Sequence, residues 1–412
     1  MVASNAVAPV GVLAFGWSAT VLLGVFVLEL AAVLWWSAVK VPFAAKRPNN
    51  AIGDHRLLGR LQAKRGGVDL PGPLPPVYLR NLPTFLVFVA VFAPIELGAA
   101  ALAFALSDPT ITAETTGQLL IGGVGVFAAR GVETAVDYVR DGGYRDHSAR
   151  SVVLAPFKSL FGVGTLLVVV GSSGVDSGAA LGLVVAGKLA YDLRAIQVER
   201  DPDRRGLFYR LYGSEETEID PEPIVEPDGD PRFSARPSRT VALVDALYRG
   251  VRYTLTSTVA VCYVLAAFLA VVATPRVALA PVAVLAAVGT LRAATRYLRY
   301  GTLEYRGYDG TVVAYDTLFD EPQQRIDRDD VRGVAVETDL VDRTFDTATV
   351  EFDCGDRSPE LQFTVPDPDE VDHDDTPGSL VAAHVDDPEA LADALGAGWI
   401  YERDVEGPAA AD

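Results

Sequence analysis

Cysteine, methionine and histidine are all scarce in this chain of 412 residues. Its two cysteines, Cys262 and Cys354, lie in an apolar stretch and an acidic stretch, so a disulfide framework is excluded. The four histidines all lie outside the apolar stretches, so neither a Ser-His pair nor a His-Glu-x-x-His zinc motif can form inside a helical bundle. No Walker-type phosphate loop or dinucleotide glycine motif is present. We therefore expect no catalytic residue, no cofactor and no metal.

Lysine is also rare. Thirty of the 35 basic side chains are arginines, and the only lysines are Lys40, Lys46, Lys64, Lys158 and Lys188. Acidic residues number 54, which gives a net charge of -19. In molar salt, carboxylates stay hydrated and their repulsion is screened over about 3 Å. An acidic surface in a mesophile would explain the acids but not the missing lysines, so the composition indicates a haloarchaeal source.

Apolar and acidic residues occupy different parts of the chain. Half of all residues are hydrophobic, yet residues 303–412 carry 30 of the 54 acidic side chains and only seven of the 35 basic ones. The preceding residues have a small positive charge and contain the long apolar runs. Such segregation predicts a membrane part followed by a strongly acidic, water-soluble part.

About 20 apolar residues in a helix cross a hydrocarbon core of about 30 Å. The first apolar stretch, 7–42, is too long for one span and breaks at Gly16-Trp17-Ser18, so we expect a short interfacial segment (5–15) and a first span (18–42). The next spans are 82–106, 117–138, 152–171 and 178–198, which complete a five-span membrane domain (1–198). With 253–273 and 277–297, about seven transmembrane helices are predicted. No basic residue precedes Lys40, so the first helix is not expected to be a cleaved signal peptide.

The basic residues of the short loops predict the orientation. Those after the first span are Lys46, Arg47, Arg56, Arg60, Lys64, Arg65 and Arg80. Three arginines also lie in the loop from 139 to 151. Both loops are expected in the cytoplasm, which puts the N-terminus outside and the C-terminal domain inside the cell membrane.

The remaining segments have distinct compositions. Residues 199–240 are rich in Pro, Asp, Glu and Arg and are predicted to be a disordered linker. A two-span membrane hairpin (241–299) follows, then an acidic domain (300–397) and a tail (398–412). Short β-branched or alternating runs at 303–305, 311–315, 334–336, 348–352 and 361–365 predict strands, and Asp387-Pro388-Glu389 begins a helix. The expected fold is an α-helical multi-pass membrane protein with a small β-sheet or barrel domain capped by one helix.

Two parts of the chain resemble known families. Residues 300–397 contain Gly301-Thr-Leu-Glu-Tyr305, Arg325-Ile326, Val331-Arg-Gly-Val334 and Leu340-Val-Asp-Arg343 before a Thr349-Val350 strand. These residues are similar to the PH-like domain of prokaryotic membrane proteins. The resemblance implies a membrane hairpin before the barrel, so it extends over about 253–397.

The first 205 residues resemble a largely haloarchaeal family of multi-pass membrane proteins with no assigned function. The likeness includes Gly11 to Gly16 followed by Trp17, a helix with Glu29, the segment Pro156-Phe157-Lys158, and Gly187-Lys188 before Asp192-Leu193-Arg194. Members of that family usually have an aromatic pair just before the first glutamate, where this chain has Val27-Leu28. The resemblance implies a membrane bundle and supplies no activity.

Inserting a charged side chain at the centre of a membrane helix costs about 2.5–3.5 kcal/mol. We therefore expect each such side chain to have a charged partner, contact with water or a functional role. The candidates are Glu29, Glu96, Arg130, Glu133, Asp137, Lys188 and Asp192. In a functional interpretation, Glu29 and Glu96 bind an ion, a proton or a small solute. In a structural interpretation, these residues pair across helices and fix the packing, and we favour this second interpretation.

The acidic domain limits the possible partners. Phosphoinositides and nucleic acids both require a basic surface, so neither is expected. Protein contact remains, either with a partner or with a second copy of the chain through an exposed strand edge. The leading hypothesis is a non-enzymatic assembly or docking protein in the membrane. The alternative is an ion- or solute-coupled transporter that uses the buried glutamates, and an intramembrane enzyme ranks lowest.

Overall fold

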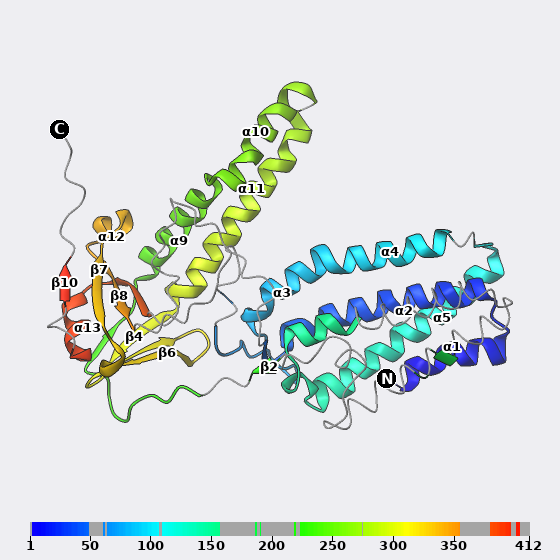
Figure 1. The fold of residues 1–412 in the computed structure, drawn as a ribbon, viewed down its shortest axis with the longest axis horizontal. Helices are drawn as coiled ribbons and strands as arrows, with labels where there is room; N and C mark the ends of the chain where they lie inside the picture. The colour runs from blue at the N-terminus through cyan, green and yellow to red at the C-terminus, as the bar shows by residue number, and fades with distance from the viewer. Residues whose placement is uncertain are drawn as a thin grey trace. The chain divides into compact units, whose positions relative to one another are not determined.

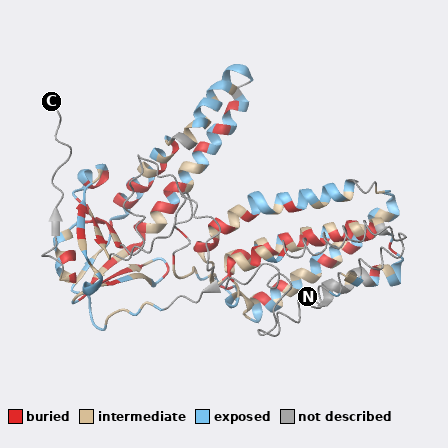
Figure 2. Cartoon of the chain, viewed as in Figure 1, coloured by how far each residue is buried: buried red, intermediate tan, exposed pale blue. Residues whose placement is uncertain are grey.

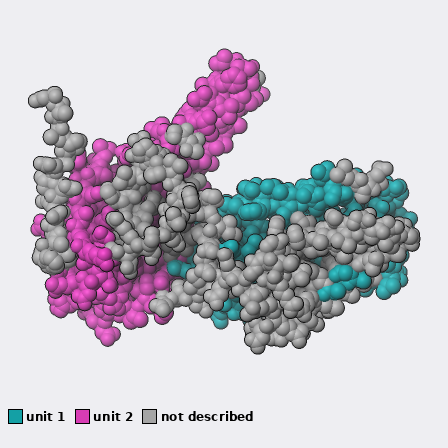
Figure 3. All heavy atoms as spheres, viewed as in Figure 1, with its two compact units in different colours: residues 1–53, 67–221 teal, residues 54–66, 222–412 magenta. Residues whose placement is uncertain are grey.

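The computed structural model describes residues 2–48, 64–106, 109–156, 223–273, 275–354 and 380–396, with a few short pieces between them (Figure 1). The chain forms two compact units (Figure 3). The first contains residues 1–53 and 67–221, and the second contains residues 54–66 and 222–412. Residues 54–66 therefore belong to the second unit, although in the sequence they lie between the first two predicted spans.

The first apolar stretch is divided as predicted. Helix α1 (Val2–Phe15) ends before Gly16, which has a φ of 61°, and α2 (Ala19–Lys40) begins after Ser18. The Ser18 side chain accepts a hydrogen bond from the Val21 backbone N–H, which satisfies one of the free donors at a helix start. Trp17 folds back onto α1, where a side chain at Gly11 would leave no room for its ring.

The second predicted span is one helix with a widened turn in it. It comprises α3 (Leu82–Val87), the π-helical turn η4 (Phe88–Phe92) and α4 (Ala93–Leu106). Within η4 the Ala93 N–H reaches the Phe88 carbonyl, five residues back. Pro94 follows directly; it has no N–H to donate, and the wider turn accommodates it inside the helix.

The third predicted span is α5 (Ala113–Glu133) continued by the π-helical segment η5 (Thr134–Arg140). It packs closely on α2 through glycines. A Cβ atom at Gly122 would lie 2.7 Å from Val25, and one at Gly131 would lie 2.7 Å from the Trp36 ring. In lipid the hydrophobic effect does not drive two apolar helices together. Small residues at the contact let the helices approach closely, so that van der Waals packing can hold them.

Short elements connect these helices in the first unit. They are η1 (Val41–Phe43), η3 (Leu79–Asn81), η6 (Gly143–Arg145) and the strands β1 (Arg47–Pro48) and β2 (Glu218–Ile219), which pair antiparallel. Asn81 donates to the carbonyls of Val41 and Ala44, so it joins the end of the first span to the start of the second.

A helical hairpin forms one part of the second unit. It contains α9 (Arg239–Thr254), α10 (Ser257–Val272), α11 (Pro275–Arg296) and the π-helical turn η7 (Tyr297–Gly301). The predicted span 253–273 corresponds mainly to α10, because the chain bends by 64° between α9 and α10. Residues along α10 and the start of α11 are mostly exposed apolar side chains, as a lipid environment requires (Figure 2).

Among the described residues, four helices are long and apolar enough to cross a membrane: Thr20–Phe43, Leu79–Ala105, Ala113–Arg140 and Arg276–Gly301. The bent pair α9–α10 would make a fifth. The predicted spans 152–171 and 178–198 lie almost wholly outside the described residues. The count of seven therefore stays a prediction.

The acidic domain consists of two four-stranded sheets. One has the order β3 (Phe233–Ala235), β4 (Leu303–Gly307), β5 (Thr311–Asp316) and β6 (Glu321–Asp327), all antiparallel. The other has the order β10 (Tyr401–Arg403), β7 (Gly333–Glu337), β8 (Ala348–Asp353) and β9 (Leu380–Val385), in which β10 and β7 are parallel. The short helices η8 (Arg328–Asp330) and α12 (Leu340–Phe345) flank β7.

One apolar core lies between the two sheets. It includes Tyr305 and Val312 of the first sheet, Phe352 of the second, and Leu391 and Leu395 of α13 (Pro388–Leu395). The Asp387 side chain caps α13 as the sequence predicts, and the helix packs against strands of both sheets. The expectation of a small sheet domain capped by one helix is confirmed.

The prediction of a disordered linker over 199–240 is wrong in its last part. Residues 233–235 form β3, which pairs with β4, and the Ser238 side chain caps α9. Phe233 and Ala235 pack against the domain core, and this burial fixes a segment whose composition alone favours disorder. Residues 199–217 of the linker and the predicted strand 361–365 lie outside the described residues.

Candidate functional site

Three of the predicted intramembrane charges form one group. Arg130 on α5 lies 3.4 Å from the Glu29 carboxylate on α2 and 3.3 Å from Glu133, one turn further along its own helix. Glu29 is buried, and the other two side chains are partly buried. This arrangement is the cross-helix pairing that the structural interpretation predicts, because a buried ion without a partner is strongly destabilising.

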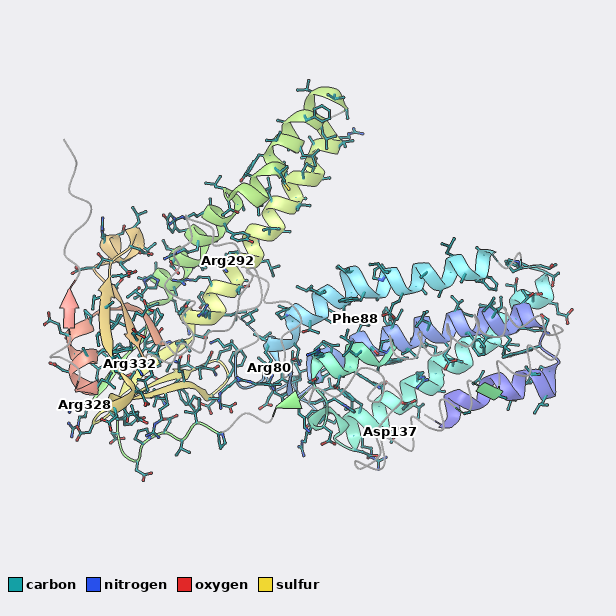
Figure 4. The ribbon with its side chains drawn as sticks, in the orientation of Figure 1. Arg80, Phe88, Asp137, Arg292, Arg328 and Arg332 are labelled. Carbon is teal, nitrogen blue, oxygen red and sulfur yellow. The ribbon has the colours of Figure 1, made fainter. Side chains whose placement is uncertain are left out.

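The other candidates differ in their surroundings. Asp137 lies in η5 near the end of the third span, where its side chain is exposed (Figure 4). The structure therefore does not bring Asp137 into the group around Arg130. Lys188 and Asp192 lie outside the described residues, so their predicted pairing is neither supported nor contradicted.

Glu96 is the exception among the described membrane charges. Glu96 is 94% buried on α4, which packs on α2, and its Oε2 atom has no hydrogen-bond partner among the residues that the structure describes. Glu96 follows the widened turn η4 by one helical turn, and such π-helical turns are frequent at functional sites. A carboxylate in this position is suited to carry a proton or to meet a cation.

A second group of charges, which we call the buried charge cluster, joins the hairpin to the acidic domain. It consists of Asp245 on α9, Arg296 on α11, Asp342 on α12 and His384 on β9, all of them buried. Arg296 Nε donates to Asp245 Oδ2 at 2.7 Å, and His384 Nε2 lies 3.5 Å from the same oxygen. The other ring nitrogen of His384, Nδ1, lies 2.7 Å from Asp342 Oδ1.

The cluster is electrically balanced when His384 carries a proton. Burial alone would lower the pKa of His384, but the two carboxylates outweigh it and raise that pKa to about 9. Burial likewise opposes ionisation of Asp342, yet its contacts with His384 and Thr347 hold the pKa of that carboxyl below its usual range. Two positive and two negative buried side chains therefore join the hairpin to the sheet domain.

Sequence reasoning did not find this cluster. His384 was treated as a histidine of the soluble domain, and about 140 residues separate Asp245 from it in the chain. The one local signal is a left-handed backbone at His384, with a φ of 57°, and such strain is visible only in the structure. The adjacent pair of Arg249 and Asp339, 3.1 Å apart, extends the contact toward solvent.

A third site lies on the sheet that contains β5 and β6, where the segment Lys64-Arg65-Gly66 is bound. Lys64 Nζ pairs with the fully buried carboxylate of Asp316, and its own side chain is 7% exposed. The Gln323 side chain accepts a hydrogen bond from the Arg65 N–H at 2.7 Å and donates one to the Arg65 carbonyl at 3.1 Å. Sequence reasoning used this segment only as part of a basic loop.

Asp316 is held in place by the domain itself. Its Oδ1 accepts from the Leu318 N–H at 2.9 Å, and its Oδ2 accepts from the Thr302 hydroxyl at 3.0 Å. Burial lowers the pKa of the Lys64 ammonium, with Asp316 opposing that shift and the nearby positive charge of Arg299 adding to it. The buried positive charge of Lys64 is therefore stabilised mainly by the Asp316 carboxylate.

The arginines at the β6–η8 edge do not form an anion site. Arg325 pairs with Asp327 at 3.0 Å, and Arg328 and Arg332 are exposed (Figure 4). In the described part of the chain, no three His, Cys, Asp or Glu side chains are grouped so that they could hold a metal ion.

Comparison with family models assigns both halves of the chain. Residues 1–206, half of the sequence, match the model of a family of unknown function, DUF6498. The chain belongs to the DUF6498 family. Residues 248–397 match the model of the bacterial PH domain, which therefore covers α10, α11 and the strands β4 to β9.

Both resemblances inferred from the sequence are thus confirmed. No curated protein and no solved structure matches the chain. This DUF6498 protein therefore combines a helical region of unknown function, rich in apolar helices, with a PH-like domain.

Proposed function

We propose that this chain is a multi-pass, non-enzymatic membrane protein whose PH-like domain is a docking module for polypeptide at the cytoplasmic face. One observation carries the proposal: the domain already holds Lys64-Arg65-Gly66, a segment from the loop after the first span. Gln323 contacts both backbone groups of Arg65, as a neighbouring strand would. The buried charge cluster supports the proposal further, because it ties the domain firmly to its membrane hairpin.

The proposed orientation puts the N-terminus outside and the PH-like domain inside. The basic loop after the first span favours the cytoplasm by the positive-inside rule. The contact between Lys64 and Asp316 requires that loop and the PH-like domain to lie on the same side of the membrane. Six predicted spans separate the two, and an even number of crossings returns the chain to the same side.

Photo-crosslinking in membranes tests the docking proposal. A photoreactive amino acid replaces Leu318, an exposed residue beside Asp316, in the full-length chain. We expect a crosslink to the peptide that contains residues 61–66, and we expect the Asp316→Asn change to abolish it. The matched control is Leu340, which is also exposed but lies on α12. Crosslinks from position 318 to lipid alone, with none to polypeptide, would contradict the proposal.

A second candidate function, ion- or proton-coupled transport, is supported by Glu96 alone. Its buried, unpaired oxygen differs from the paired carboxylate of Glu29. We expect Glu96→Gln to reduce proton or cation flux into proteoliposomes while Glu29→Gln acts mainly on stability. Equal flux with the wild-type protein and the Glu96→Gln variant would exclude this candidate.

A further inference from the structure

We propose that the docking site of the PH-like domain recognises the tripeptide Lys-x-Gly, and that the chain's own Lys64-Arg65-Gly66 is its resident occupant. This inference rests on the proposed docking function and specifies its ligand. Each position of the tripeptide is read by a different contact.

The first position is selected as lysine. The Lys64 side chain enters beside Thr302, with its Nζ on Asp316 Oδ2 and 5.9 Å from the centre of the Phe319 ring. An arginine would bind a carboxylate best through both oxygens at once. Here Oδ1 already accepts from the Leu318 N–H, and Oδ2 accepts from both the Thr302 hydroxyl and the Lys64 ammonium. In this socket, formed by Asp316, Thr302 and Phe319, an ammonium adds one hydrogen bond to Oδ2. A guanidinium that used both oxygens would compete with the Leu318 and Thr302 donors, so we expect lysine to be preferred.

The second position is read through its backbone alone. Gln323 Oε1 accepts from the Arg65 N–H, while Gln323 Nε2 donates to the Arg65 carbonyl and also to the Glu321 carbonyl. The bond to Glu321 orients the amide before a peptide arrives. Because both contacts involve main-chain atoms, any residue other than proline satisfies them.

The third position is restricted to glycine. Gly66 has a φ of 79°, in the left-handed region that most side chains avoid. A Cβ atom there would lie 2.7 Å from the Phe319 Cβ and 2.9 Å from the Glu321 carboxylate. The first of these contacts is with an atom next to the backbone, which cannot move aside easily.

The composition of the chain adds an independent argument. Only five lysines are present among 35 basic residues, and Lys64-Arg65-Gly66 is the single Lys-x-Gly sequence in all 412 residues. One of these five lysines thus stands at the position where the Asp316 carboxylate receives a single cation. The chain also carries a single segment that fits the site.

The test uses the full-length Lys64→Ala chain in detergent, which leaves the socket empty. The probe is a fluorescent nine-residue peptide centred on Ala-Lys-Arg-Gly-Gly, and binding is followed by fluorescence anisotropy. We expect this peptide to bind at least tenfold more tightly than peptides with Ala-Arg-Arg-Gly-Gly or Ala-Lys-Arg-Ala-Gly. We also expect the further change Asp316→Asn to remove the difference, whereas Asp309→Asn, at an exposed pair on the same domain, should retain it.

The outcomes separate this inference from the docking function itself. Equal binding of the lysine and arginine peptides, or of the glycine and alanine peptides, overturns the Lys-x-Gly specificity. The docking function would then still stand if the crosslink from position 318 to residues 61–66 is found. Absence of both the crosslink and peptide binding rejects the two proposals together. Tryptic cleavage after Arg65 gives a second readout in case Lys64→Ala folds poorly, since Lys64→Arg should accelerate it and Lys46→Arg should not.

Discussion

Single side chains, rather than long motifs, determine how the second unit holds together. His384 lies between Asp245 and Asp342, and Arg296 and the partly buried Arg249 both pair with Asp245, so the charge of a protonated His384 balances Asp342. Lys64 and Asp316 form a comparable buried pair. In both places, removal of one partner leaves an unbalanced charge in a dry environment, which costs about 3–5 kcal/mol.

The stability of the second unit should fall as the pH rises. The pKa of His384 is raised from an ordinary value near 6.5 to about 9, which corresponds to a contribution on the order of 3 kcal/mol. A raised pKa means that this contribution is complete below about pH 6.5 and is lost as the pH passes through 9. Thermal unfolding at several pH values measures it.

The variant His384→Asn serves as the control for that experiment. Asparagine tolerates the left-handed backbone at this position, so the change removes the titrating ring with little added strain. We expect the variant to be less stable at pH 6.5 and to show no loss between pH 6.5 and 9. An unchanged pH profile in His384→Asn would show that His384 does not titrate as described.

At the scale of helices and strands, the sequence predicted an element's ends best where one or two neighbouring residues determine them. Gly16 and Ser18 mark the break between α1 and α2, and Asp387 with Pro388 marks the start of α13. The short strand β3 escaped prediction because its stability comes from β4 and the core, not from its own composition. The bend between α9 and α10 lies at residues 254–258, where the predicted span 253–273 begins, and hydropathy gives no direction for the helix that precedes it.

The binding sites were less predictable than the helices. Hydropathy locates Glu29, Glu96 and Arg130 at membrane depth, and the pairing of Glu29 with Arg130 was among the expected outcomes. The contact of Lys64 with Asp316 joins residues 252 positions apart, and no periodic pattern encodes it. The rarity of lysine in the chain was the one available clue.

The packing of α9 on α11 should be sensitive to a single methyl group. A Cβ atom at Gly250 would lie 2.5 Å from the Gly289 carbonyl oxygen, so Gly250→Ala is expected to destabilise the hairpin by about 1–3 kcal/mol. Hydrogen exchange in α9 and α11 measures the effect. Gly98→Ala on α4 is the control, because its Cβ would enter open space. Unaltered exchange in Gly250→Ala would mean that the two helices are not this close.

For the whole molecule, the proposed orientation predicts which loops are accessible from outside the cell. In a background without Cys262 and Cys354, single cysteines at Leu74, Ile111 and Leu340 report three exposed positions. We expect a membrane-impermeant maleimide to label intact cells at position 111 only, and to label all three positions after the cells are opened. Labelling of position 74 or position 340 in intact cells would show that the loop or the domain lies outside the cell, which contradicts the proposed orientation.

The central claim is that the PH-like domain holds Lys64 in a buried socket, and amine labelling of membranes tests it most directly. With so few lysines, mass spectrometry can compare the acetylation rate of Lys64 with that of the half-buried Lys46. We predict that Lys64 reacts at least tenfold more slowly than Lys46 in the wild-type chain and at a similar rate after Asp316→Asn. Equal rates in the wild-type chain would contradict the docked segment and the function built on it.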